Sequence, residues 1–392
     1  MFSSRLNWDA PPNPLLQSLA AKRAAGVEIL DLTESNPTRA GFTYDERDIL
    51  NTIARPQSLL YEPSPRGLPS ARQAVADYYR DRGRVIAPDS IFLTASTSEA
   101  YGHLFKLLAD PGDEILVPQP GYPLFDFLSA LDSVRQIYYP LSYDDALGWQ
   151  INFERLRAAI GPRTRAIVVV NPNNPAGNYL KQRELAELNT LCAGRRLALI
   201  VDEVFSDYSH GADSQRVETA VGNEGALTFV LSGLSKIAGL PQMKLGWIQI
   251  GGPEPLVAAA CARLEFIADT YLSVSASIQH AAPILLASRR HIQQQITSRI
   301  DGNYGWLNQQ CAQSSKRQVL NREGGWYAVL EFHDSVSDDE RVNQLLELDS
   351  VFVHPGYFYD FIREGYLVLS LITPTVTFRT GIERILSRWG FQ

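Results

Sequence analysis

The sequence predicts an α/β protein with a large, mostly parallel sheet and a smaller α+β unit. The chain has 392 residues, which is more than one hydrophobic core usually organises, so two domains are expected. Through the middle of the chain, uniformly apolar runs of strand length alternate with helix-length segments, a pattern typical of a parallel sheet covered on both faces. Toward the C-terminus the strand-like runs are shorter and lie between helical patterns, which indicates a second unit of a different kind.

The expected elements of the large unit follow in chain order. A Pro-rich start should form an arm or a short helix, and a turn-rich stretch at 33–38 follows a short apolar strand. Hydroxyl side chains from Ser96 to Ser98 should cap the start of a helix. The expected strands are 27–32, 91–94, 115–117, 166–170, 197–201 and 227–231, and the further helices are 69–80 and 184–192.

The smaller unit should contain short strands at 325–332, 351–353 and 366–371 and helical regions at 282–312 and 337–348. The long helical region near 280–290 marks the expected boundary between the units. We therefore expect residues 1–45 to form an N-terminal arm and part of the small domain. Residues 46–285 should form the large domain, and residues 286–392 the C-terminal small domain.

Composition and charge argue against several classes of function. The net charge of −7 does not suit a nucleic-acid surface, which would need a concentrated basic face. The three cysteines show no metal-ligand or disulfide spacing, and the six histidines form no metal pair. No secretory signal is visible at the start, and no apolar run approaches the length of a membrane span. The sequence therefore predicts a cytoplasmic protein without a metal and without a nucleic-acid or membrane partner.

Lys236 lies just after the apolar run at 227–231, and a second lysine, Lys244, follows eight residues later. A lysine at the end of a buried strand is costly to bury unless its charge is removed or paired. Formation of a Schiff base would remove the free amine. The alternative is a surface lysine that follows a strand, and this stretch alone does not decide between the two.

Other polar residues also stand where expected strands end. Ser96, Asn171, Asp202 and Lys236 each follow a strand or come at its last residue. Open α/β sheets bind ligands at the carboxyl ends of their strands, so these residues are expected to meet in one site.

Short motifs accompany these residues. In chain order they are PGDE at 111–114, PGYP at 120–123, NPNNPAG at 171–177, VDEV at 201–204 and Lys236. In their order and spacing the chain resembles the class I and II aminotransferases, enzymes of the aspartate-aminotransferase-like fold type I that use pyridoxal 5′-phosphate (PLP). The resemblance runs from about Leu30 to Ile385. It implies a large PLP-binding domain with a mostly parallel seven-stranded sheet.

The resemblance implies a role for each residue around the cofactor. Lys236 would hold PLP as a Schiff base and then move a proton between the substrate Cα and the cofactor. Asp202 would pair with the pyridine nitrogen, Asn174 would donate to the phenolic oxygen O3′, and Tyr122 would stack on the ring. The alternatives are a helix N-cap for Asp202, a turn asparagine for Asn174 and a core tyrosine for Tyr122.

The cofactor phosphate is expected at a helix start, where free N–H groups and the helix dipole favour an anion. The resemblance implies that the phosphate site is formed by Ser96, Thr97, Ser98, Ser232, Ser235 and Lys244. It also implies that Tyr61 reaches the phosphate of the neighbouring subunit, which would make the protein a homodimer with a shared active site. Asn36 is implied as a substrate-binding residue.

The chain also departs from the family pattern. Ser96 stands where a glycine is usual, and Gly233 stands where a serine is common. Lys244 replaces the usual phosphate-binding arginine, which keeps the charge but loses the two-pronged geometry. Phe205 replaces a tyrosine that would donate to O3′, so one hydrogen bond to the cofactor is expected to be missing.

The largest departure concerns the substrate carboxylate. The carboxylate-binding arginine of the family aligns with Val368, and no arginine lies between Gly365 and Phe378. Arg363 is the nearest replacement and Arg379 a weaker one, although Arg363 can equally be a solvated loop charge. We therefore expect aspartate and glutamate to be poor substrates.

The leading function is an aminotransferase that passes an amino group between an amino acid or amine and a 2-oxo acid. The alternative is a PLP-dependent lyase, cyclase or decarboxylase on the same scaffold, because the usual arginine is Val368. A non-catalytic effector-binding module is a weaker third reading, because Lys236, Asp202, Asn174 and Tyr122 are all present.

Overall fold

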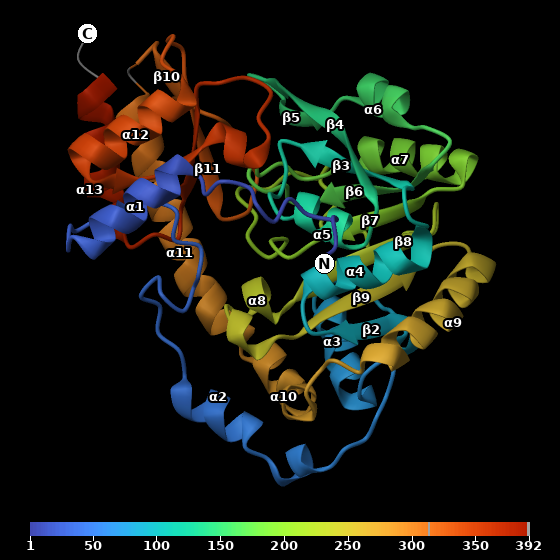
Figure 1. Cartoon of the computed structure of the whole chain (residues 1–392). Coiled ribbons are helices and arrows are strands. Elements are labelled where there is room, and N and C mark those ends of the chain that lie inside the picture. The colour runs from blue at the N-terminus through green and yellow to red at the C-terminus, as the bar shows by residue number, and fades with distance from the viewer. Residues whose placement is uncertain (313, 390–392) are drawn as a thin grey trace.

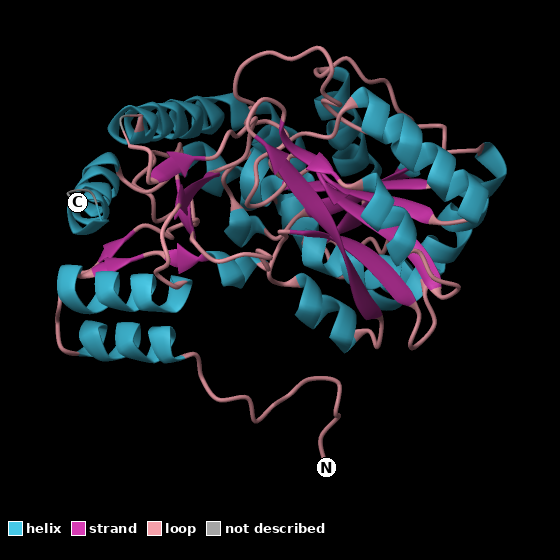
Figure 2. Ribbon diagram, turned by 90° about the horizontal axis from the view of Figure 1, so that it is seen from above, coloured by secondary structure: helices cyan, strands magenta, loops and turns pink. Residues whose placement is uncertain are grey.

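The computed structural model describes residues 1–312 and 314–389. They form a large unit around an eight-stranded sheet and a smaller unit around a four-stranded sheet (Figure 1). Figure 2 shows helices on either side of the large sheet and the small sheet set apart from it. The expected α/β class with a mostly parallel large sheet is confirmed.

The large sheet has the strand order β2-β9-β8-β7-β6-β3-β4-β5. Its central strands from β8 to β4 run parallel to one another. β9 is antiparallel to both of its neighbours, and β5 is antiparallel to β4. The strands are β2 Ile91–Thr94, β3 Glu114–Gln119, β4 Arg135–Asp144, β5 Gly148–Ile151, β6 Thr164–Val170, β7 Ala198–Asp202, β8 Thr228–Gly233 and β9 Gly246–Gly251.

Strands buried on both faces were predictable, whereas strands of mixed exposure were not. β2, β6, β7 and β8 are almost wholly buried, and each was expected within a few residues of its observed bounds. β4 was missed because most of its side chains are partly or fully exposed, so it shows no continuous apolar run. The expected count of seven strands is wrong, because β5 pairs with the second half of β4 from Leu141↔Ile151 to Asp144↔Gly148 and adds an eighth.

Two layers of helices bury the two faces of this sheet in separate hydrophobic clusters. One cluster contains Leu188 of α7 and Leu285 of α10, and the other contains Phe105 of α4 and Leu264 of α9. The helices of the large unit are α3 Pro69–Arg80, α4 Thr97–Leu108, α5 Phe125–Leu131, α6 Phe153–Ala159, α7 Gln182–Arg195, α8 Leu234–Ile237, α9 Glu254–Tyr271 and α10 Ala276–Ala287.

The small unit combines both ends of the chain in a third hydrophobic cluster. Leu15 and Leu19 share this cluster with Leu345 and Ile382. Its antiparallel sheet has the order β10-β11-β14-β13, and β1 and β12 form a separate parallel pair. The elements are α1 Pro14–Ala24, β1 Leu30–Asp31, α11 Arg289–Cys311, β10 Arg317–Val319, β11 Tyr327–Phe332, α12 Asp338–Asp349, β12 Val351–Phe352, β13 His354–Pro355, β14 Tyr366–Ser370 and α13 Thr375–Trp389.

The expected strand at 27–32 is only the two residues of β1. β1 ends at Asp31, whose carboxylate accepts hydrogen bonds from the Thr33 N–H at 2.9 Å and from the Thr33 hydroxyl at 2.6 Å. These hydrogen bonds turn the backbone away from β12. The domain limits proposed from the sequence stay a prediction.

The segment with α2 Glu46–Ile53 lies at the edge of the molecule in Figure 1 and packs on α10. Short 3₁₀ helices are η1 Pro56–Leu59, η2 Pro88–Ser90, η3 Pro241–Met243 and η4 Gly356–Tyr359. Among the described residues, no helix combines the length and apolar character needed to cross a membrane.

Candidate active site

A cavity of about 310 Å³ opens at the carboxyl ends of β6, β7 and β8. Most of the residues singled out from the sequence line it, together with Ser35 and Tyr327 from the small unit. The predicted residues that line the cavity are Ser96, Thr97, Ser98, Tyr122, Asn174, Asp202, Ser235, Lys236 and Lys244. The expected convergence at the strand ends is thus present for Ser96, Asp202 and Lys236. Asn171 does not line the cavity, because its side-chain amide is buried and hydrogen-bonded to the backbone of Val217 and Leu180.

Lys236 sits in α8, the four-residue helix that follows β8 directly. Its carbonyl accepts a hydrogen bond from the Tyr208 hydroxyl at 2.6 Å. Its Nζ lies 4.8 Å from the ring centroid of Trp326 and 5.6 Å from that of Phe205. Burial lowers the pKa of Lys236 to about 8, and the nearby Asp202 opposes this shift. Near neutral pH a substantial fraction of this amine is therefore unprotonated and nucleophilic.

Asp202 is the last residue of β7 and is buried. Its carboxylate accepts a hydrogen bond from the Tyr101 hydroxyl at 3.1 Å and another from the Val204 N–H at 3.1 Å. Burial outweighs these contacts and raises the pKa of Asp202 to about 6. A cationic ligand in the cavity would reverse this shift, because an opposite charge favours the carboxylate.

The start of α4 forms one end of the cavity, as the sequence suggested. Ser96 caps this helix, its hydroxyl accepting from the Glu99 N–H at 3.1 Å, and Thr97 and Ser98 form the first turn. Ser235 and Lys244 complete this end of the lining. The helix N-terminus and the lysine together provide a positive environment for an anion.

The close approach of the β9 backbone explains why residue 233 is glycine and not the serine that is common in the family. A Cβ atom built on Gly233 would lie 2.8 Å from the Leu245 carbonyl oxygen and 2.9 Å from Gly246 Cα. Both atoms belong to the backbone, so any side chain at residue 233 would push β8 and β9 apart.

Asn174 and Tyr122 lie on the walls between these two ends. The Oδ1 atom of Asn174 is buried and has no hydrogen-bond partner. Burial raises the pKa of Tyr122 to about 12, so its hydroxyl is neutral, and its ring makes an edge contact with Phe125. The cavity thus combines a free amide, a neutral aromatic ring, a reactive amine, a positive helix end and a buried acid that has hydrogen bonds but no ion pair. Together these fit the groups of PLP.

Four of the predicted residues lie outside the cavity lining. Ser232 is buried and its hydroxyl donates to the Glu203 carbonyl at 3.4 Å. The side-chain oxygen of Asn36 accepts from Thr38, and its neighbour Ser35 takes the place at the cavity. Tyr61 is 77% exposed and borders a separate hollow of about 220 Å³.

Arg363 is the fourth of these residues. Its side chain is 72% exposed, and its guanidinium pairs with Glu331 at 3.0 Å and contacts the Tyr366 hydroxyl. Arg379 also lies away from the cavity lining, with its guanidinium over the Trp306 ring. Neither arginine stands at the substrate end of the cavity.

The sequence did not single out Ser35, Tyr327 or Tyr101. Tyr327 lies in β11 of the small unit, and a hydrogen bond joins its side chain to Ser35. Tyr101 lies on α4, one turn after the residues that cap the helix. None of the three follows a strand of the large sheet, so the strand-end signal could not find them.

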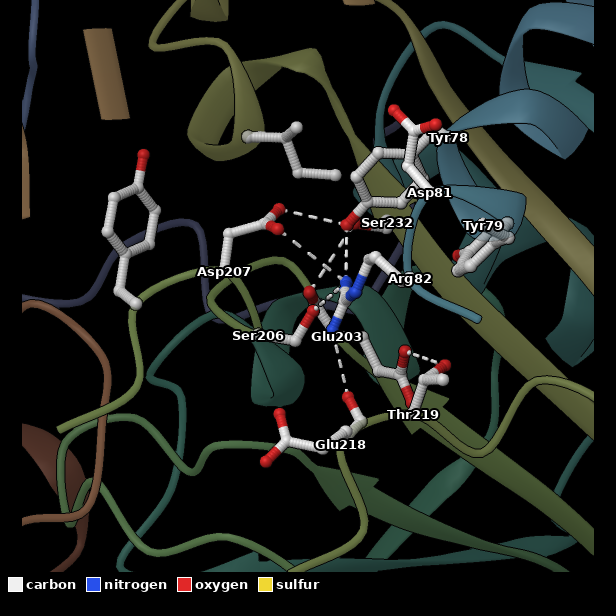
Figure 3. Close-up of polar contacts among 12 residues, drawn as sticks. Tyr78, Tyr79, Asp81, Arg82, Glu203, Ser206, Asp207, Glu218, Thr219 and Ser232 are labelled. Atoms are coloured by element: carbon white, nitrogen blue, oxygen red, sulfur yellow. Dashed lines mark hydrogen bonds and ion pairs between the residues drawn. The ribbon is translucent and has the colours of Figure 1, made fainter. Parts of the chain in front are cut away.

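A buried polar network supports the loop that follows Asp202 (Figure 3). Arg82, just beyond α3, donates to the Ser206 hydroxyl at 2.8 Å and to the Glu218 carbonyl at 2.9 Å, and it also contacts the Tyr78 hydroxyl. Tyr78 in turn donates to Asp207 at 2.8 Å. This loop carries Phe205 and Tyr208, which both contact Lys236, so the network indirectly holds the lysine.

Glu203 belongs to the same network. Its two oxygens accept from the Thr219 hydroxyl and from the Ala220 N–H, each at 2.6 Å. Burial raises the pKa of Glu203 to about 7, and the Arg82 charge opposes that rise. Arg82 therefore stabilises two buried acidic side chains, Glu203 and Asp207.

Removing Arg82 should strongly destabilise the fold. We expect Arg82→Leu to lower the free energy of unfolding by about 3 kcal/mol or more, because it leaves Asp207 and Glu203 buried without their cation. Arg80→Leu is the matched control, since Arg80 is a mostly exposed arginine at the last residue of α3, two residues before Arg82. Urea unfolding of both variants measures this, and equal stabilities would contradict the role given to the network.

Comparisons with known proteins agree with this geometry. The family model described as aminotransferase class I and II matches residues 29–385. The glutamate-pyruvate aminotransferase AlaA of Escherichia coli is 29% identical over 285 residues, which cover 72% of this chain and 70% of that protein. An alanine aminotransferase of Mycobacterium tuberculosis is 26% identical over 391 residues, covering 95% of this chain and 88% of that protein.

A solved structure shows the same fold. The alanine aminotransferase from Pyrococcus furiosus superimposes with a TM-score of 0.88 at 22% identity, covering 99% of both chains. The family match spans nearly the whole chain. The chain therefore belongs to the class I and II aminotransferases and depends on PLP.

Proposed function

We infer that Lys236 and Asp202 are the central residues of an aminotransferase that passes an amino group between an amino donor and an oxo acid. The observation that carries this assignment is the pair itself: a buried amine and a buried acid at the ends of neighbouring strands, with pKa values shifted toward the neutral forms. Perturbed groups of this kind in a cavity are typical of catalytic sites.

The residues around this pair would hold PLP along its length. Asp202 would bind the pyridine nitrogen, Tyr122 the ring face and Asn174 the phenolic oxygen. The start of α4, with Ser235 and Lys244, would bind the phosphate. When bound, PLP supplies an electron sink for the charge that develops at the substrate Cα.

Lys236 is the group that can move a proton at the substrate Cα. The lowered pKa makes its amine a better base near neutral pH than an exposed lysine. Tyr208 holds its backbone carbonyl, and Trp326 and Phe205 border its Nζ. These contacts cover one side of the amine and limit its range of motion.

The lyase, cyclase or decarboxylase alternative rests only on Val368. The relatives described above are all named as aminotransferases, acting on alanine or on glutamate and pyruvate by their names. We therefore assign the transferase reaction to this chain.

We further propose a homodimer in the cytoplasm, with Tyr61 of one subunit at the cofactor phosphate of the other. The support is an exposed apolar segment, in which Leu59 is 89%, Leu60 60% and Tyr61 77% exposed. An exposed apolar segment of this kind is typical of a surface that another protein covers.

Replacing Lys236 should abolish cofactor attachment. We expect Lys236→Ala to lack the visible absorbance band of the bound cofactor and to have no measurable turnover. Lys106→Ala is the matched control, because Lys106 pairs with Asp132 on the protein surface. A band of unchanged position and intensity in Lys236→Ala would show that another residue holds the cofactor.

Asp202→Asn should change stability and activity in opposite directions. The folded-state pKa of Asp202, about 6, lies above the ordinary aspartate value of 3.8. The stability of the cofactor-free protein should therefore fall by on the order of 3 kcal/mol as pH rises through this window. Asparagine stays neutral, so cofactor-free Asp202→Asn should gain stability relative to the parent between pH 4 and pH 7.

Turnover of the same variant should fall by about 10³ or more, because the cofactor ring loses its charged partner. Asp269→Asn, at an exposed position, is the control for both measurements. A stability difference between variant and parent that does not change with pH, or full activity in Asp202→Asn, would contradict the assignment.

A mixing experiment tests the shared active site. Lys236→Ala and Tyr61→Ala should each be nearly inactive alone. After subunit exchange, hybrid dimers would hold one intact site, so the mixture should recover about a quarter of the parent activity. No recovery in mixtures shown by mass to contain hybrids, or full activity in a monomer, would refute the shared site.

A further inference from the structure

The small unit contributes one wall of the cavity through Ser35 and through Tyr327 of β11, and β14 lies beside β11 without lining the cavity itself. Tyr327 of β11 lines the cavity, and Val329, two residues on, projects from the same face of the strand. Val329 pairs directly with Val368 of β14, and Tyr327 pairs with Ser370. Val368 is therefore the diagonal neighbour of Tyr327 on the adjacent strand, and it lies on the same face of the sheet, the face that Tyr327 turns toward the cavity.

The described residues of this sheet face offer no positive charge near Val368. Arg363 contacts Glu331 and Tyr366, which pair with each other two residues further along the strands than Val329 and Val368. The Arg363 side chain points largely into solvent. His354 pairs with Val368 from β13, but burial lowers the pKa of His354 to about 4, so it is neutral at pH 7. Its Nδ1 lies 3.2 Å from the Tyr359 hydroxyl.

The loop that faces this wall adds negative charge instead. Burial raises the pKa of Tyr327, a hydrogen bond with Ser35 opposes the rise, and the Glu34 carboxylate adds to it. The Ser370 hydroxyl donates to the Glu34 carbonyl at 2.6 Å and fixes the loop against β14. The polar groups at this end of the cavity are thus two hydroxyls, of Ser35 and Tyr327, beside a carboxylate.

Among the described residues that line the cavity, only Lys236 and Lys244 are cationic. Both lie in the segment that follows β8, and the proposed function uses both for the cofactor. A substrate carboxylate at the wall formed by the small unit would lose its hydration without gaining an ionic partner, and it would meet the field of Glu34. Hydrogen bonds to charged groups are stronger than those between neutral groups, so a carboxylate that finds no such partner here binds less tightly.

We propose that this site prefers amino donors without a carboxylate on the amine-bearing carbon, namely primary amines whose neighbouring group is apolar or hydroxylated. The Ser35 and Tyr327 hydroxyls would bind the hydroxyl of such a donor, and Val204 and Phe205 of the cavity lining would contact its apolar part. The inference rests on the proposed transferase function. The donor is oxidised by two electrons: its nitrogen and the electron pair of its Cα–H bond would pass to the bound cofactor, its Cα proton to Lys236, and it leaves as an aldehyde or ketone whose oxygen comes from water. A carbonyl acceptor would then take up the nitrogen, the electron pair and a proton, and its oxygen leaves as water.

The test uses the PLP-loaded parent protein and pairs of donors that differ only in the carboxylate. The pairs are phenylalanine with 2-phenylethylamine, phenylalanine with phenylalaninol, and alanine with alaninol. Loss of the visible cofactor band in single-turnover mixing gives a second-order rate constant for each donor. We expect each carboxylate-free donor to exceed its amino acid by about tenfold or more. Higher rate constants for the amino acids would overturn the inference and leave the transferase assignment intact.

A cofactor band that no donor in the panel changes would instead contradict the transferase function on which the inference depends. Calorimetric titration of Lys236→Ala gives a second readout that requires no turnover, because this variant can hold added PLP without the covalent bond but lacks the base. In the variant saturated with added PLP, phenylalaninol should bind more tightly than phenylalanine. The reverse order of affinity would also overturn the preference.

Val368→Arg is the variant that should reverse the preference. It is expected to raise the rate constant for phenylalanine by about tenfold and to lower that for phenylalaninol. Val368→Leu, a change of volume without charge, should leave the ratio of the two near that of the parent. Circular dichroism and cofactor content establish that each variant is folded. An arginine variant that folds and keeps the parent ratio would show that residue 368 does not face the donor.

Discussion

The burial of two ionisable side chains, Asp202 and Lys236, is the constraint on which the rest of this site depends. Asp202 is buried at the end of β7, and Lys236 follows the neighbouring strand β8 in α8, with its Nζ beside the rings of Trp326 and Phe205. Burial opposes the charge on both, and their mutual attraction only partly offsets it. The charged forms of both side chains are therefore disfavoured. A cofactor with a ring cation and a reactive carbonyl would relieve this, because the cation pairs with Asp202 and the carbonyl reacts with Lys236. Arg82 and Tyr208 hold the surrounding backbone in place.

Much of this arrangement could be predicted from the sequence, because it depends on short-range patterns. The apolar runs of the central strands located the sheet, and the polar residue after each run located Asp202, Asn174 and Lys236. The pattern fails where side-chain exposure is mixed, as in β4. It also cannot show which residue of a turn faces inward, so Asn36 was chosen where Ser35 lines the cavity. Tyr327 comes from a different sheet, and its position depends on how the two units pack.

The departures from the family pattern have physical reasons that only the structure reveals. Gly233 is required because the backbone of β9 approaches too closely for any side chain. Phe205 packs edge-on against Trp326, with ring centroids 5.4 Å apart, so its apolar ring belongs to an aromatic cluster beside Lys236. Val368 belongs to a sheet face without positive charge. In each case the neighbours of the residue, and not that residue alone, would have to change to restore the usual side chain.

The small unit is assembled from the first forty residues and the last hundred, and this has a consequence for how the chain is made. Leu15, Leu19 and Leu32 pack against side chains from Ile292 onward. On the ribosome these leucines emerge before their partners and must wait, exposed to chaperones and to other nascent chains, until the segment from Ile292 onward has been translated. The large sheet is built from contiguous sequence and can form in the meantime. Residues that are translated before the large sheet therefore reach their native position after it.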